Sequence, residues 1–249
     1  MSLAGRMTSV VAAPSEAFEA VKHSPPCPAN WLAPALLLIL VTWLGTAIIF
    51  SQPAINQQIL EASQQAMEKQ FQKANVPPEQ AERARQVAEK WVPISAKIGA
   101  GLAPIFVGFV GPFIWGLFVW LIGAKAFKGG FPYMKAVEAV GLANVIAALE
   151  AVVRTLLVLS LDNVYATPSL GLLVMKGFDP QNTVHGLLSA VNVMTFWVLA
   201  ARSIGLARLA NVSLAKAAGC VFGFWVGYTG FFLGLGAASK AIMSGMRGS

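Results

Sequence analysis

Five apolar stretches, each long enough to cross a lipid bilayer, set the strongest limit on how this chain folds. A helix needs about 20 apolar residues to cross a hydrocarbon core of about 30 Å. The stretches are 31–50, 98–124, 136–160, 183–201 and 214–238. The composition agrees, because 56% of the residues are hydrophobic and 12% are charged. We predict an all-α polytopic integral membrane protein, a bundle of about five transmembrane helices.

The second stretch is the longest of the five, and it contains Pro104 and Pro112. Proline removes a backbone donor and collides with the preceding helical turn. We therefore expect this span to tilt, to kink or to break into two pieces.

The chain divides into an amino-terminal segment, residues 1–30, and a five-span membrane domain, residues 31–249. In the first part, Ser15 follows Pro14 and can cap a short helix that carries Phe18 and Val21 on one side. We expect this amphipathic helix to lie on the cytoplasmic surface of the membrane.

The loop 51–97 is the one large hydrophilic stretch between spans. Two helical patterns are separated by Pro77 and Pro78, which predicts an external helical hairpin. The first helix carries a narrow apolar stripe, consisting of Ile55, Ile59, Leu60, Met67 and Phe71. We assign the stripe to contact with a partner or a second copy. The alternative is a connector that packs on the bundle itself.

Basic residues in the short loops predict the orientation in the membrane. Eight Lys and Arg fall on the side that holds the amino terminus: Arg6, Lys22, Lys125, Lys128, Lys135, Arg202, Arg208 and Lys216. The opposite side holds fewer basic residues in its short segments. We therefore expect a cytoplasmic amino terminus and an external carboxyl terminus.

Four polar residues within the third and fourth stretches form a candidate intramembrane cluster: Glu150, Arg154, Ser189 and Asn192. Counting about 1.5 Å per residue from the outer ends places them at similar depths. An unpaired charge there would cost several kcal/mol, so we expect Glu150 to pair with Arg154 and Ser189 or Asn192 to complete the hydrogen bonding. The alternatives are a polar site for a proton or small ligand, and an Arg154 that extends outward to water.

The last stretch carries glycines at helical spacing, namely Gly219, Gly223, Gly227, Gly230 and Gly234. Such spacing lets a neighbouring helix approach the backbone closely. We favour packing within the monomer over a homodimer face.

No pattern in the sequence indicates catalysis. His23 and His185 have no Cys or His at metal-ligand spacing, and Cys27 and Cys220 form no CxxC pair. Serine-nucleophile and phosphate-binding motifs are absent, and the basic residues form no nucleic-acid-binding block. We expect no enzyme activity, no catalytic residue, no metal, no cofactor and no nucleic-acid partner.

The order of these elements resembles the Yip-one family of membrane proteins, in particular its bacterial members. The resemblance extends over most of the chain. Its most specific residues are Pro14, Glu16 and Phe18 near the start, and Phe196, Trp197, Ile204, Gly205 and Leu206 around the end of the fourth stretch.

The resemblance implies five spans with the amino terminus in the cytosol. Eukaryotic relatives act in the early secretory pathway and bind small Rab-type GTPases, and they use a longer amino-terminal arm than the segment 1–30. We therefore expect no small GTPase as partner and place the chain in a bacterial inner (cytoplasmic) membrane.

The expected function is that of a non-enzymatic protein that organises or assists other membrane proteins, as an accessory subunit of a transport assembly. Its partners would be the lipid bilayer and other membrane proteins or itself. The competing function is a transporter that moves a small substrate through a polar site in its own bundle. Broken helices and buried polar residues are typical of such transporters, whereas the five-span count without an evident inverted repeat favours the accessory role.

Reporter fusions test the predicted orientation. Fusions at the amino terminus and at Lys128 should report a cytoplasmic location, because the short basic loops stay on that side. Fusions after Gln72 and at the carboxyl terminus should report an external one. An external signal at Lys128 would reverse the assignment.

Overall fold

The computed structural model describes residues 1–180 and 182–245, with the side chains of 73 and 237–245 left aside. This part of the chain is helical, which confirms the predicted fold class. The α-helices are α1 (Leu3–Ala12), α2 (Pro14–His23), α3 (Ala29–Phe50), α4 (Pro53–Ala74), α5 (Pro78–Phe109), α6 (Gly111–Trp120), α7 (Tyr133–Leu161), α8 (Thr183–Ala190), α9 (Val193–Ala210) and α10 (Leu214–Gly245). A π-helical turn, η1 (Leu121–Ala126), follows α6, and a 3-10 segment, η2 (Leu170–Gly177), precedes α8.

Five helical stretches among the described residues are long and apolar enough to cross a membrane, as predicted. They are Ala29–Phe50, Pro78–Ala126, Tyr133–Leu161, Val193–Ala210 and Leu214–Gly236. The second is broken at Val110, where α5 ends and α6 begins with Pro112 in its first turn. A missing proline N–H is tolerated in a first turn, which explains why the break falls there.

The fourth span begins ten residues later than the sequence pattern indicated. Residues 183–190 form the separate short helix α8, and the chain leaves helical geometry at Val191 and Asn192. The Asn192 side chain then caps α9 by accepting from the amides of Met194 and Thr195. This shift moves Arg202 and Arg208 from the predicted loop into the helix.

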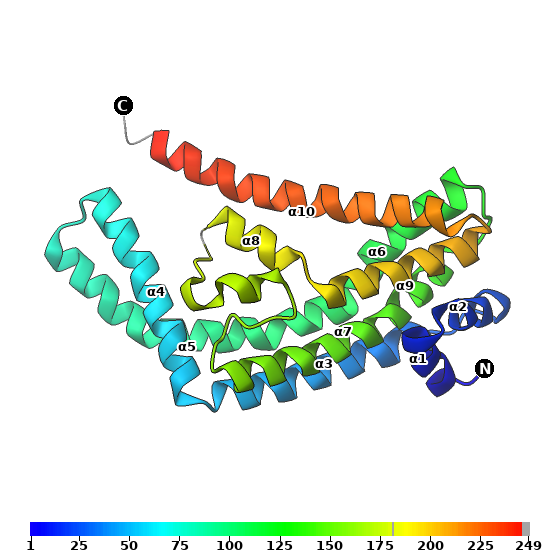
Figure 1. Cartoon of the computed structure of the whole chain (residues 1–249), viewed down its shortest axis with the longest axis horizontal. Helices are drawn as coiled ribbons and strands as arrows, with labels where there is room; N and C mark the ends of the chain where they lie inside the picture. Colours follow the sequence, from blue (N-terminus) through cyan, green and yellow to red (C-terminus); the bar gives the residue numbers. More distant parts are fainter. Residues whose placement is uncertain (181, 246–249) are drawn as a thin grey trace.

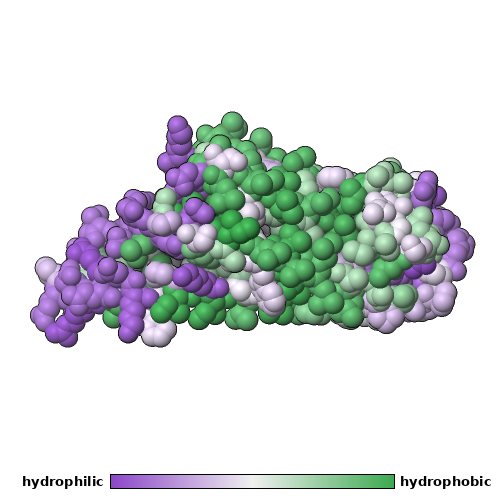
Figure 2. Space-filling view, turned by 90° about the horizontal axis from the view of Figure 1, so that it is seen from below, coloured by the Kyte–Doolittle hydropathy of each residue, from purple (hydrophilic) through white to green (hydrophobic). Residues whose placement is uncertain are grey.

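The long helices lie lengthwise beside one another, and the loops and short helices gather at the two ends (Figure 1). One end holds α1, α2 and the loops after η1 and α9. Lys22 Nζ lies 2.5 Å from Asn211 Oδ1, which joins two of these segments. The other end holds the hairpin of α4 and α5, together with α8. The segments predicted to share one side of the membrane therefore lie at the same end of the bundle (Figure 1), and Figure 2 shows an apolar band between two hydrophilic ends.

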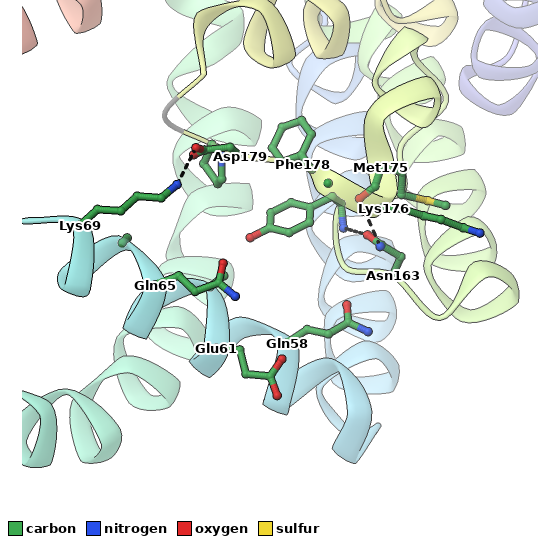
Figure 3. Close-up of a pocket in the computed structure, with 14 residues that line it drawn as sticks. Gln58, Glu61, Gln65, Lys69, Asn163, Met175, Lys176, Phe178 and Asp179 are labelled. Carbon is green, nitrogen blue, oxygen red and sulfur yellow. Dashed lines mark hydrogen bonds and ion pairs between the residues drawn. The ribbon is translucent and has the colours of Figure 1, made fainter.

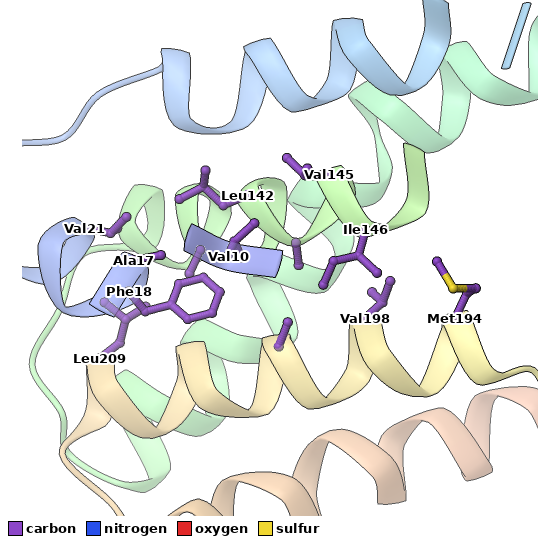
Figure 4. Packing of buried hydrophobic residues seen from close by; sticks show 13 residues of the cluster. Val10, Ala17, Phe18, Val21, Leu142, Val145, Ile146, Met194, Val198 and Leu209 are labelled. Carbon is purple, nitrogen blue, oxygen red and sulfur yellow. The ribbon is translucent and has the colours of Figure 1, made fainter. Parts of the chain in front are cut away.

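The amino-terminal helices are part of the bundle and not a layer on the membrane surface. Val10, Ala17, Phe18 and Val21 are fully buried in a core with α7 and α9 (Figure 4). Phe18 faces Gly205 of α9, where a Cβ would lie 3.4 Å from its ring. The prediction that α2 lies on the membrane surface is wrong, because the apolar side of this helix packs against α7 and α9.

Glycines allow close helix contacts at places other than the predicted one. A Cβ at Gly141 of α7 would lie 2.5 Å from Trp31 Cα of α3, and one at Gly116 of α6 would lie 3.1 Å from Val137 Cα. On α10, a Cβ at each of Gly219, Gly223, Gly227, Gly230 and Gly234 would meet nothing within 4 Å. The expectation that the α10 glycines pack within the monomer is therefore wrong.

Two matched substitutions test this distinction. Gly141→Ala should lower the free energy of unfolding by about 1–3 kcal/mol, because the added methyl group forces α3 away from α7. Gly223→Ala should leave it unchanged or raise it slightly, because alanine favours helix and nothing contacts this position. The measurement is thermal unfolding in one detergent, and equal losses in both variants would contradict the packing described.

Candidate functional site

A short hydrogen bond joins Glu150 of α7 to Asn192 at the start of α9. The Asn192 amide donates to Glu150 Oε1 at 2.6 Å. Its oxygen accepts from the backbone amides of Met194 and Thr195 at 2.8 and 3.3 Å. Both ends of this 7% exposed side chain are therefore engaged, and the carboxylate is held at a helix start. The predicted proximity of Glu150 and Asn192 is confirmed.

The expected ion pair between Glu150 and Arg154 is not formed in the part of the chain that the structure describes. Arg154 is exposed, and whether its side chain extends outward to water stays a prediction. Ser189 lies on α8 against Gly171 and forms no hydrogen bond with the carboxylate within the described residues. The candidate cluster thus reduces to Glu150 and Asn192.

A second polar site, which the sequence analysis missed, lies deeper along the same helices. Arg202 of α9 donates from Nη2 to Asn144 Oδ1 of α7 at 3.4 Å. Its guanidinium also lies over the Trp115 ring of α6, 4.4 Å from the centroid. Arg202 Nε and Asn144 Nδ2 are buried without a hydrogen-bond partner among the described residues. The signal that could have placed Arg202 inside a span was Asn192, a good helix cap directly before an apolar run.

A third polar cluster closes the end of the bundle that holds the amino-terminal helices. Lys135 and Glu138 of α7 form a buried ion pair at 3.2 Å, with side chains 5% and 1% exposed. The ammonium group also donates to the carbonyls of Val21 and Pro25. The carboxylate accepts from the Cys27 amide, as well as from the Asn30 side chain at 2.7 Å. These contacts fasten the connector between α2 and α3 to α7.

A cavity of about 520 Å³ opens at the opposite end, between α4 and the segment 163–180 (Figure 3). Glu61, Gln65 and Lys69 line one wall, and Lys69 forms an ion pair with Asp179 at 2.9 Å. Tyr165 lines the other wall, and burial together with the negative charge of Asp179 raises the pKa of its hydroxyl. The cavity is open to solvent, and its lining is mixed in polarity. It is therefore a gap between α4 and the segment 163–180 and not an enclosed pocket.

The apolar stripe of the hairpin, on α4, is buried in the bundle at its base and only partly buried farther along the helix. Ile55 is 1% exposed and packs with Ile49 and Val158, and Ile59 lies against this core. The partner contact predicted for Ile55 is therefore wrong, because the base of α4 packs on its own bundle. Leu60, Met67 and Phe71 are partly buried, and their contact with a partner stays a prediction.

The His and Cys residues do not form a metal site in the described part of the chain, where no three His, Cys, Asp or Glu residues gather. His23 contacts Glu19 on α2 at 2.9 Å. His185 accepts from the Asp179 amide and packs beside Phe178.

Five apolar helices, joined to two amino-terminal helices in one core, define a polytopic membrane protein. A family model described as the Yip1 domain matches residues 8–236, and the chain belongs to this family. The match begins within α1 and ends with the fifth apolar span. It therefore includes the residues around Phe18 and those around Gly205, on which the resemblance to the family rested. A search of curated proteins and a search of solved structures gave no match.

A double-mutant cycle tests the contact between Glu150 and Asn192. Asn192→Ala should cost about 2–4 kcal/mol of unfolding free energy, because it removes a helix cap and a bond to a carboxylate. Glu150→Gln should cost less, and the coupling between the two changes should be about 1–2 kcal/mol. Arg154→Met serves as control and should change stability by less than about 0.5 kcal/mol. Coupling of Glu150 to Arg154 instead of Asn192 would refute the arrangement.

Proposed function

We propose that this member of the Yip1 domain family is a non-enzymatic membrane adaptor that binds another integral membrane protein and serves as an accessory subunit of a transport assembly. The observation that carries the proposal is the position of α10. Within its most apolar stretch, 6% of the residues are buried, against 56% for α9. Its contacts with the rest of the chain are made mainly to α9 and α8. Most of its surface is thus free to meet lipid or another helix.

The open glycines of α10 favour a protein neighbour over lipid alone. At 100° per residue, the five positions from Gly219 to Gly234 fall within a sector of about 80°. They extend over about 22 Å, most of the thickness of a hydrocarbon core. Small residues on one side of a helix let a second backbone come close enough for dispersion contacts and Cα–H hydrogen bonds. The strip is therefore suited to a helix of the partner.

The described residues also support the non-enzymatic part of the proposal. The polar groups along α7 are each held by a different neighbour: Glu138 by Asn30, Asn144 by Arg202, and Glu150 by Asn192. Asn30 lies on α3, whereas Arg202 lies on α9 and Asn192 caps its start, so the three sites join α7 to two neighbouring helices. Their hydrogen bonds hold the bundle together, which gives these polar groups a structural use. A bacterial inner membrane, with the amino terminus in the cytoplasm, completes the proposal.

One observation favours the competing function, a transporter for a small substrate. Arg202 and Asn144 each keep a buried donor without a partner in the part of the chain that the structure describes, which suits an anionic group. A transporter of this kind would work alone. Purified chain in vesicles should then take up a small anion, and Arg202→Gln should abolish uptake.

Purification from the native membrane in mild detergent tests the adaptor. A second membrane protein should stay bound to the unchanged chain. With the double variant Gly223→Leu, Gly227→Leu, the amount of bound partner should fall at least about tenfold, because the leucine side chains keep the partner helix away. The thermal stability of the purified variant should stay the same, since a Cβ at either position would meet nothing within 4 Å in the described part of the chain.

Phe232→Leu is the matched control, because it changes an exposed residue on another side of α10. It should retain the partner. Recovery of the chain alone, or retention of the partner by the double variant, would refute the proposal.

A further inference from the structure

A cavity of about 550 Å³ lies where α9 ends and α10 begins, and α2 forms its third side. The residues that matter to its chemistry are Ser15, Glu19, Ile204, Arg208, Asn211 and Val212. The apolar spans end at Ala210 and begin again at Leu214, so the cavity opens at the boundary between hydrocarbon and water. Its position is that of the lipid headgroups on the side of the amino terminus.

The two charged groups of the cavity have opposite signs and come from different helices. Arg208 of α9 is exposed and forms no ion pair within the described residues. One carboxylate oxygen of Glu19 on α2 accepts from His23 Nε2 at 2.9 Å, and this hydrogen bond lowers the pKa of Glu19. The carboxylate is therefore ionised at neutral pH. Arg208 and Glu19 do not pair with each other within the described residues, so the Arg208 guanidinium and the second carboxylate oxygen of Glu19 are left for a ligand.

The remainder of the lining is apolar where it meets the membrane. Ile204 and Ala207 of α9 and Val212 and Leu214 beyond it face the cavity. A ligand that fits these walls carries an anion for Arg208, a cation for Glu19 and apolar chains that continue into the bilayer. A zwitterionic phospholipid has this composition.

The polar groups also distinguish between headgroups. A primary ammonium can donate N–H bonds to the Glu19 carboxylate and the Ser15 hydroxyl, whereas a quaternary ammonium has no N–H to donate. Quaternary ammonium groups are recognised by aromatic rings, and none of the described residues that line this cavity is aromatic. A purely anionic headgroup would meet repulsion from Glu19. We propose that the cavity binds phosphatidylethanolamine, with the phosphate on Arg208 and the ammonium group on Glu19.

Thermal unfolding of the full, delipidated chain in detergent tests the site. Added phosphatidylethanolamine at about 100 times its Kd should raise Tm by about 5–10 °C, because a ligand of the folded state stabilises it by mass action. Phosphatidylcholine and phosphatidylglycerol with the same acyl chains should raise Tm by less than about 2 °C. Soluble glycerophosphoethanolamine should give no comparable rise, because it lacks the acyl chains.

Two variants separate the two charges. Arg208→Gln should abolish the response to phosphatidylethanolamine, because it removes the phosphate partner. Glu19→Gln should also lose it but gain a response to phosphatidylglycerol, because the repulsion disappears. Glu16→Gln on α2 and Lys216→Gln on α10 lie outside the cavity and should behave as the unchanged chain.

Three outcomes would overturn the proposal. An equal response to phosphatidylcholine would show that the ammonium group is not recognised. An undiminished response to phosphatidylethanolamine in both cavity variants would place the lipid elsewhere. A full response to the soluble phosphate ester would mean that the cavity takes a free metabolite instead of a lipid.

Discussion

The buried ion pair of Lys135 and Glu138 is the contact on which the arrangement of one whole end of the molecule depends. Two buried charges are stable only when their remaining donors and acceptors are satisfied. Here the connector between α2 and α3 supplies those groups, through the carbonyls of Val21 and Pro25, the Cys27 amide and the Asn30 side chain. These contacts fix the position of α2. They thereby also fix the core around Phe18 and one wall of the cavity between α2, α9 and α10. The amino-terminal segment is therefore a structural part of the bundle.

The membrane-spanning helices differ in how much of their surface is buried against one another. Helices α3, α7 and α9 share close contacts, helped by Gly141 against Trp31, whereas α10 stands at the edge with its glycines open. In a bilayer an exposed apolar helix carries no penalty, because lipid solvates it as well as protein does. A loosely held edge helix can thus persist in the free chain and still accept a partner. This property connects the fold to the proposed adaptor role.

Counting residues along each span was enough to predict that Glu150 and Asn192 lie at a common depth, because the rise of a helix is fixed. It could not predict which neighbour Glu150 faces. Arg154 is four residues away on the same helix, yet it is exposed, and the amide of Asn192 takes the bond instead. Arg202 was missed for a related reason. The apolar run continues from 183 to 201, and nothing in hydropathy shows that the chain stops being helical at Val191.

The sequence by itself determined the all-α membrane class, the five spans, the break near Pro112 and the hairpin after the first span. Each of these depends on local properties, namely the length of an apolar run or the backbone limits of proline. Only the tertiary structure decided that α2 packs inside the bundle, that Gly141 and not Gly223 forms a close contact, and that Arg208 and Glu19 share one cavity. These features depend on how each helix is rotated about its axis against its neighbours. Hydropathy carries no information about that rotation when lipid and protein are equally apolar surroundings.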